Sequence, residues 1–171
     1  MGTFRIILIF IFSLILINNA QSFTDSDGRG AQSDGRDDSS FLKAKNSNFK
    51  KGKDALNQAL KYEKKNKVKK ANKRFNDSID YFLLANEEFP KSIEILNYLG
   101  FTFYKVGDLI MSEIYYLEGL NLDPKNNQIN EHLGKLYLNT KRINLAKERL
   151  EVLNSCNCKE YTGLKNLIDK N

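Results

Sequence analysis

The most reactive side chains in this sequence are two cysteines, Cys156 and Cys158, which are separated by one residue. In an oxidising compartment two such thiols form a disulfide, which would hold a closing helix over residues 159–170 against the element before it. A ring this short is strained and more reducible than an ordinary bridge, so a thiol redox role is an alternative. Two thiolates also supply half of a tetrahedral metal site. A reduced pair that only packs is the remaining interpretation.

Other catalytic chemistry has few candidate residues. Nucleophilic and acid–base catalysis need a base beside its partner, and His132 is the only histidine. The sequence has no glycine-rich phosphate loop and no pair of histidines at metal-binding spacing. Asp25 and Asp27 alternate as in a calcium loop, but Arg29 and Arg36 occupy positions that need oxygen donors. We therefore expect no enzyme activity, no metal and no cofactor, with His132 on a helix surface or lining a groove.

The net charge of +6 is concentrated in one segment. Residues 41–74 carry thirteen basic and two acidic side chains, whereas the segments 21–40 and 75–171 each have three more acidic than basic residues. The lysines surround the expected helix, which disfavours an amphipathic helix lying in a membrane. A helix kept soluble by its charge and electrostatic docking to an acidic protein or an anionic lipid surface both stay open. Nucleic acid is disfavoured, because only Tyr62 interleaves with these lysines.

The first twenty residues have the order of a secretory signal peptide. Arg5 precedes the apolar run Ile6–Ile17, and Ala20 is a small residue at the cleavage position. Twelve helical residues rise about 18 Å, which is short of the roughly 30 Å core of a bilayer, so an uncleaved anchor is the weaker interpretation. We expect a periplasmic or secreted protein. Residues 21–40 are rich in Gly, Ser and Asp and predict a disordered acidic linker.

A period of thirty-four residues organises the rest of the chain. It separates Pro90 from Pro124 and Gly100 from Gly134. The same spacing relates Leu99 to Leu133, Phe103 to Tyr137, Ser112 to Ala146 and Tyr116 to Leu150, and one step back it reaches Ser78, Phe82 and Ala85. Apolar residues recur every three and four positions and predict an all-α chain. Glycine lets the two helices of one hairpin approach closely, and proline ends a helix before the turn.

This pattern resembles the tetratricopeptide (TPR) signature. The segment LNYLGFTFYKVGDLIMSEIYYLEGLNLDPKN carries it, with Leu96 in place of the leading tryptophan. We predict a TPR-like solenoid of antiparallel helix hairpins over residues 41–171. Its expected parts are a modified repeat at 41–92, repeats at 93–126 and 127–157, and a capping helix at 158–170.

A closer resemblance links LNYLGF, EHLGKLYL and VLNSCNCKEYTGLKNLI to small exported TPR proteins of alphaproteobacteria. Those chains also end with a cysteine pair followed by E-Y-x-x-L-K. The resemblance implies a Gram-negative source and a periplasmic location, and it implies no reaction. Two features differ: the cysteines are closer together, and KYEKKNKVKKANKR is inserted in the first repeat, adding about four helical turns.

The expected function is binding of a protein or peptide partner in the concave groove, where the first helices of such repeats lie. We expect the groove to be lined by two aromatic and five polar or charged residues: Asn97, Phe101, Tyr104, Lys105, Glu131, Lys135 and Asn139. Aromatic and fixed polar groups suit an extended peptide. A complete Lys, Asn and Arg clamp for a terminal carboxylate is not present. With about three repeats the stack is near its minimum size, so self-association into a dimer stays open.

Overall fold

A computed structural model describes the backbone of residues 38–170 and the side chains of residues 47–170. The predicted signal peptide and most of the predicted linker lie outside these residues. The helices are, in order, α2 (Asp38–Lys64), α3 (Val68–Glu88), α4 (Ile93–Val106), α5 (Leu109–Leu122), α6 (Asn127–Asn139), α7 (Ile143–Leu153) and α8 (Lys159–Ile168). No strand occurs in the described part of the chain, which confirms the all-α prediction. None of these helices is long and apolar enough to span a membrane.

The beginning of α2 corrects one predicted boundary. The acidic linker was expected to reach residue 40, but helix α2 begins at Asp38. The helical segment starts with Asp38, Ser39 and Ser40. Asp and Ser are among the residue types favoured at a helix N-terminus.

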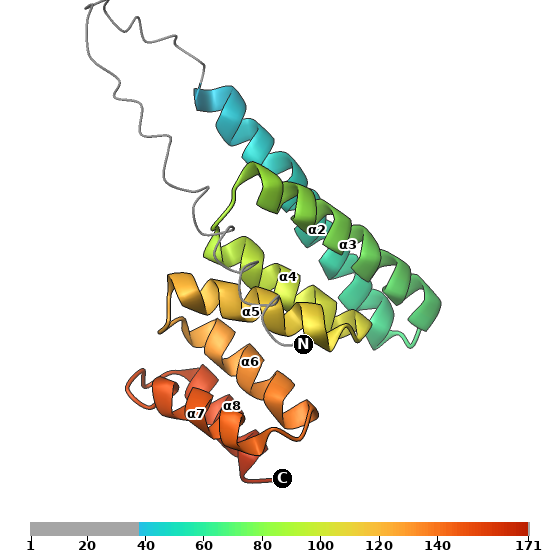
Figure 1. The fold of residues 1–171 in the computed structure, drawn as a ribbon. Coiled ribbons are helices and arrows are strands. Elements are labelled where there is room, and N and C mark those ends of the chain that lie inside the picture. Colours follow the sequence, from blue (N-terminus) through green and yellow to red (C-terminus); the bar gives the residue numbers. More distant parts are fainter. Residues whose placement is uncertain (1–37, 171) are drawn as a thin grey trace, which may run out of the picture. The chain divides into compact units, whose positions relative to one another are not determined.

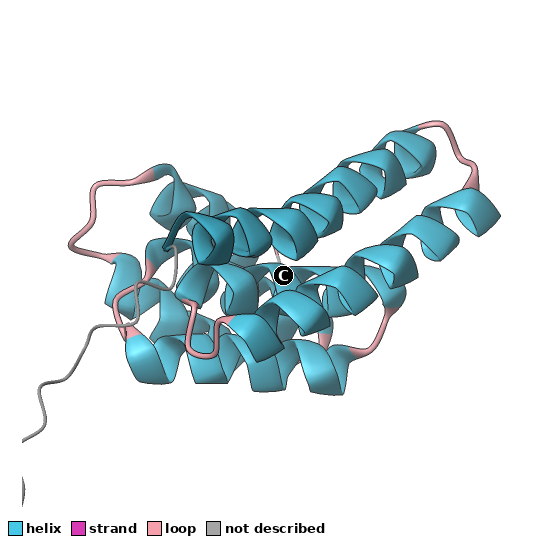
Figure 2. Ribbon diagram, turned by 90° about the horizontal axis from the view of Figure 1, so that it is seen from above, coloured by secondary structure: helices cyan, strands magenta, loops and turns pink. Residues whose placement is uncertain are grey.

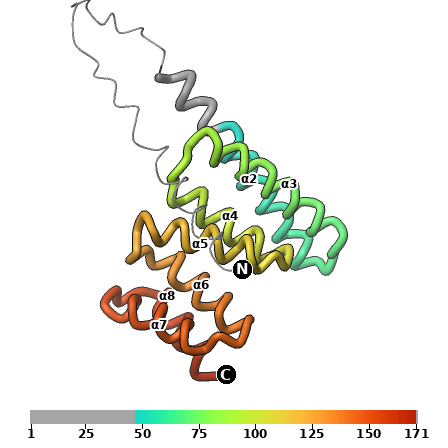
Figure 3. The backbone as a smooth tube through the Cα atoms, in the orientation of Figure 1, coloured from blue at the N-terminus to red at the C-terminus, as the bar shows by residue number. Residues whose placement is uncertain are grey.

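The helices form three antiparallel hairpins and a closing helix. Helix α2 pairs with α3, α4 with α5 and α6 with α7, and each hairpin packs on the next through α3 with α4 and α5 with α6. Helix α8 packs on α6 and α7 at the C-terminal end of the stack (Figure 3). This arrangement confirms the predicted hairpin solenoid with a capping helix.

Within each of the first two hairpins, the same kind of contact joins the two helices. In the second, the Ser112 hydroxyl donates a 2.8 Å hydrogen bond to the Gly100 carbonyl. A Cβ at Gly100 would lie only 2.5 Å from the buried Tyr116 ring, so the helices approach at a distance that only glycine permits. In the first hairpin Ser78 donates to the Gly52 carbonyl at the same 2.8 Å. The predicted role of the glycine in close helix approach is therefore observed in both hairpins.

The inserted segment lengthens both helices of the first hairpin. Ser78 follows its glycine partner by 26 residues, whereas Ser112 follows its partner by 12. The difference of fourteen residues equals the length of the segment Lys61–Arg74, which contains the end of α2, the turn and the beginning of α3. In both views the turn of this hairpin lies beyond the turns of the other two (Figure 1, Figure 2). The insertion is thus an extension of a regular repeat.

The third hairpin departs from the expected contact. A Cβ at Gly134 would meet the side chain of Leu164 on α8 at 2.5 Å, and all of its nearest atoms belong to that leucine. Close approach of α7 at this glycine stays a prediction, because the three nearest atoms belong to the capping helix. Helix α8 lies against α6 and fills the space with fully buried Leu164. The glycine therefore seats the capping helix.

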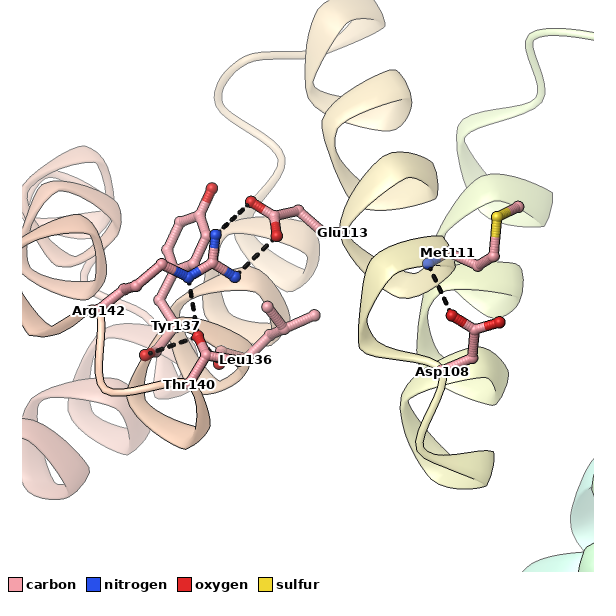
Figure 4. Close-up of polar contacts among 7 residues, drawn as sticks. All are labelled: Asp108, Met111, Glu113, Leu136, Tyr137, Thr140 and Arg142. Atoms are coloured by element: carbon pink, nitrogen blue, oxygen red, sulfur yellow. Dashed lines mark hydrogen bonds and ion pairs between the residues drawn. The ribbon is translucent and has the colours of Figure 1, made fainter.

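An arginine fork fixes the third hairpin on the second (Figure 4). Arg142, in the turn between α6 and α7, donates from Nη1 and Nη2 to the two carboxylate oxygens of Glu113 on α5, at 2.8 and 2.7 Å. Its Nε donates to the Thr140 hydroxyl at 2.9 Å, and the guanidinium lies 4.5 Å from the Tyr137 ring centre. The fork fixes the position of α5 relative to α6. Helix α6 contributes residues to the groove lining.

Candidate binding groove

The first helices of the three hairpins enclose a groove of about 690 Å³. Its lining comes from the second half of α2, the first two-thirds of α4, and the beginning of α6 with the residue before it. The lining residues are Leu56, Asn57, Leu60, Ile93, Glu94, Asn97, Tyr98, Phe101, Asn126, Gln128 and His132. A volume of this size lies within the usual range of ligand sites.

The apolar part of the groove rests on a packed aromatic cluster. Tyr98 stacks on the fully buried Phe82 ring with a centroid distance of 5.1 Å, and Phe49 meets both rings at 5.6 to 5.8 Å. Lys53 lies 5.1 Å from the Phe49 ring centre and 4.0 Å from a Glu94 oxygen. Because these rings are held by core contacts, the apolar floor of the groove is preformed, which lowers the entropic cost of binding.

A chain of hydrogen bonds crosses the groove from α6 to α4. The Asn97 Nδ2 group donates to the Gln128 Oε1 atom at 3.3 Å, and the His132 Nδ1 atom lies 3.0 Å from Asn97 Oδ1. Since an amide oxygen only accepts, His132 carries its proton on Nδ1. The Gln128 amide nitrogen and the His132 Nε2 atom stay available as donor and acceptor. The network fixes the orientation of Asn97, whose residue type and position were predicted.

His132 is uncharged at neutral pH. Its ring packs 5.5 Å from the Phe101 centroid and 5.7 Å from the Tyr116 centroid. Burial lowers the pKa of His132 to about 4, Lys135 acts in the same direction, and Glu160 opposes them. The groove lining therefore holds one charged side chain, the Glu94 carboxylate, and no Lys or Arg.

Two of the seven predicted groove residues, Asn97 and Phe101, line the groove. The other five lie elsewhere. Tyr104 packs against the C-terminal core, and Lys105 forms a 2.6 Å ion pair with Glu63. Glu131 pairs with Lys135 at 2.8 Å, and Asn139 is exposed at the end of α6.

The reasons for these positions are specific to this chain. Glu63 belongs to the insertion, so the lengthened first hairpin supplies a partner that takes Lys105 away from the groove. Glu131 lies beside α8, where a Cβ at Gly163 would be 2.8 Å from its carboxylate oxygen. Neither contact follows from a repeat period. Lys105 and Glu131 are not among the residues that line this hollow, and binding roles for the predicted set stay a prediction.

Sequence reasoning missed the wall formed by α2, namely Leu56, Asn57 and Leu60. A signal for two of these residues was available. Counting from the hairpin glycines, Leu56 and Asn57 follow Gly52 by the same steps as Tyr104 and Lys105 follow Gly100. These two register positions therefore line the groove in the first repeat, as Leu56 and Asn57, and not in the second, as Tyr104 and Lys105. Successive hairpins of a solenoid are rotated, so each contributes a different level of its first helix.

The cysteines lie at the opposite end of the domain from α2. Cys156 and Cys158 form a disulfide in the turn between α7 and α8, and both are half-buried against the C-terminal core. No group of three or more His, Cys, Asp or Glu side chains within the described residues is arranged to hold a metal ion. The bridge immediately precedes α8, as a staple for the capping helix would. A redox role stays untested.

The fold defines this chain as a tetratricopeptide-like helical repeat protein. Among solved structures it is similar to the first TPR of Spaghetti (RPAP3) bound to HSP90 peptide SRMEEVD, with a TM-score of 0.53 and 16% identity over 71% of this chain and 93% of that chain. It is also similar to the Arabidopsis OM64 TPR domain, with a TM-score of 0.54 and 13% identity over 72% of this chain and 98% of that chain. Identities this low establish the fold alone. No protein-family model and no curated protein sequence matches the chain.

Proposed function

We propose that this protein is an exported, non-catalytic interaction module that binds an extended segment of a partner protein in the groove. The observation that carries the proposal is the preformed hollow of about 690 Å³ between α2, α4 and α6, with an apolar floor and amide side chains on its walls. Clefts of this kind are the default binding sites of helical repeats. The apolar run at residues 6–17 supports export to the periplasm or beyond.

The lining favours an uncharged, partly apolar segment. Leu60, Ile93 and Phe101 offer apolar contact, while Asn57 and the free amide nitrogen of Gln128 can bond to a peptide backbone. The peptide bound by the related Spaghetti TPR, SRMEEVD, is acidic. This groove has Glu94 as its one charged lining residue and no cation, so the lining offers no charged partner to the carboxylates of an acidic peptide. A free C-terminal carboxylate is therefore not required here.

The test uses random peptides displayed on phage and selected on the full chain. Asn57→Arg places a long charged side chain on the groove wall, at an exposed position that contributes no core contact. It should weaken a selected peptide at least tenfold, the loss expected for a blocked central contact. Asn121→Arg on α5 is the matched control, because Asn121 is also an exposed asparagine and lies outside the lining.

Two results would refute this function. Selected peptides that bind the Asn57→Arg variant as tightly as the unaltered protein would place binding elsewhere. A second experiment tests the ligand class. It compares the affinity of each selected peptide in two forms, one with a free C-terminal carboxylate and one with a C-terminal amide. Equal affinities are expected, and a strong requirement for the carboxylate would contradict a groove whose lining contains no cation.

A further inference from the structure

The extension of the first hairpin adds a surface that the repeat fold does not need. In the regular second repeat, twelve residues separate the glycine from the serine that bonds to it. The fourteen residues Lys61–Arg74 lie beyond that unit, at the free end of α2 and α3. Of these residues, Ala71 is the one that is buried. Stability therefore gives little reason for the composition of the extension.

The composition is strongly cationic. The extension contains eight Lys or Arg side chains and one acidic residue, Glu63. Glu63 is already paired with Lys105 on α4 at 2.6 Å, so it does not neutralise the lysines at the turn. Nearer the body of the domain, Lys73 and Arg74 both contact Asp77. The uncompensated charge is thus concentrated in the seven residues 64–70, which contain five lysines and no acidic residue.

We call residues 64–70 the cationic tip. Lys64, Lys65, Lys67 and Lys69 are exposed and form no ion pair with the described residues, and Lys70 lies over the Tyr62 ring at 5.9 Å. Val68, at the first position of α3, is 63% exposed. Like charges held this close repel one another, and the first turn of α3, the positive end of the helix dipole, has no acidic residue. An external anionic surface would offset this repulsion.

We propose that the cationic tip docks end-on to anionic phospholipid headgroups. Lysines placed all round a helix cannot serve a helix that lies flat in a membrane. At the end of a projecting hairpin, however, lysines on every side of the turn reach the same plane together. Val68 is then the apolar side chain nearest the interface. A membrane supplies a plane of diffuse charge, which fits flexible lysines without a shaped pocket.

Other polyanions fit the tip less well. Single-stranded nucleic acid is bound through aromatic rings on which bases stack, and the one ring in the extension, Tyr62, is covered by Lys70. Specific recognition of acidic peptides favours the planar fork of arginine, and the tip contains lysine alone. Anionic lipid is therefore the class of ligand that the tip favours.

The test is cosedimentation of the full chain with phosphatidylcholine vesicles, with and without phosphatidylglycerol. The apolar run at residues 6–17 is present in every variant, and neutral vesicles measure its contribution. Each lysine near an anionic surface contributes about a fivefold gain in affinity, so the triple variant Lys65→Gln, Lys67→Gln and Lys69→Gln should lose about 100-fold of the preference for anionic vesicles. The preference of the unaltered chain should also fall steeply between about 0.05 and 0.5 M salt.

The matched control removes three exposed lysines from other elements, as Lys125→Gln, Lys147→Gln and Lys170→Gln. It has the same net charge as the tip variant and should keep most of the preference. Equal losses in both variants would show a general effect of net charge and overturn the proposal. So would the absence of any preference for anionic vesicles. Binding of polyglutamate or of a single-stranded oligonucleotide that depends on the tip, without such binding to vesicles, would assign the surface to a different ligand.

Discussion

Replacing Arg142 should measure how strongly the third hairpin is fixed to the second. The side chain makes three separate contacts: a two-bond fork with Glu113, a bond to Thr140 and a stack on Tyr137. Lysine keeps the charge but cannot form the fork or the planar stack. The pair Arg142→Lys and Arg142→Ala therefore separates the charge from the geometry.

The size of the effect follows from the exposure of the two partners. The Arg142 side chain is 37% exposed and the Glu113 side chain 24%, so the pair is partly screened by water. An exposed ion pair contributes about 0.2–1 kcal/mol, and a charge-assisted bidentate bond contributes about twice an ordinary hydrogen bond. Adding about 0.5 kcal/mol for the stack on Tyr137, we expect Arg142→Ala to cost about 2 kcal/mol and Arg142→Lys about 1 kcal/mol.

The assay is urea unfolding of Arg142→Ala, Glu113→Ala and the double variant. Such a cycle isolates the pairwise free energy, which we expect to be about 1–1.5 kcal/mol at low salt and smaller at high salt. The exposed pair formed by Lys165 on α8 and Asp169 directly after that helix, with an N–O distance of 2.8 Å, is the control and should show a much smaller coupling. Equal coupling for both pairs, or an Arg142→Lys variant as stable as the original, would refute the importance of the fork.

Two further predictions concern His132 and the hairpin glycines. The pKa of His132 is about 4 in the folded chain, whereas a histidine in the unfolded chain has a pKa of 6.5. Between these two pH values the unfolded state therefore binds more protons than the folded state. The free energy of unfolding should therefore fall as the pH drops from 6.5 toward 4, by up to about 3 kcal/mol more than in the His132→Gln variant. Unfolding both proteins at several pH values measures this difference, and parallel pH profiles would contradict the burial of the His132 ring. Gly100→Ala should cost about 2 kcal/mol because the new Cβ would lie 2.5 Å from Tyr116, whereas Gly107→Ala, with φ of 87° and open space around it, should cost about 1 kcal/mol. Adding Tyr116→Leu should lessen the first loss and not the second, and strictly additive effects would exclude the steric explanation.

The sequence predicted the architecture well because the repeat pattern is local. The fixed spacing of Gly100, Ser112 and Tyr116 encodes one helix pair, and each of these residues makes its contact within that pair. The insertion was also recognised, from the resemblance to chains with a shorter first repeat, and Ser78 still bonds to the Gly52 carbonyl across the added residues. The contacts between the two helices of a hairpin can therefore be predicted from the sequence of a single repeat.

Groove and cap depend on contacts between elements, which the period does not encode. Lys105 turns to Glu63 because the insertion brings that carboxylate beside α4. Gly134 receives Leu164 because α8 packs on α6. The rotation between successive hairpins determines which residues along each first helix face the groove. The packing across hairpins sets these positions. The pattern of one repeat placed Asn97 and Phe101, but it did not show that Leu56 and Asn57, at the register positions of Tyr104 and Lys105, line the groove in their place.

The same helix carries the groove wall and the beginning of the cationic extension, and the two differ in chemistry. Leu60 closes the groove wall, and Lys61, the next residue, begins the extension. Attraction between exposed charges decays over about 8 Å at physiological salt, whereas apolar burial is not weakened by salt. Added salt should therefore release anionic vesicles while peptide binding in the groove persists. Because the tip has a net positive charge and the groove lining contains no cation, the two surfaces favour different ligands.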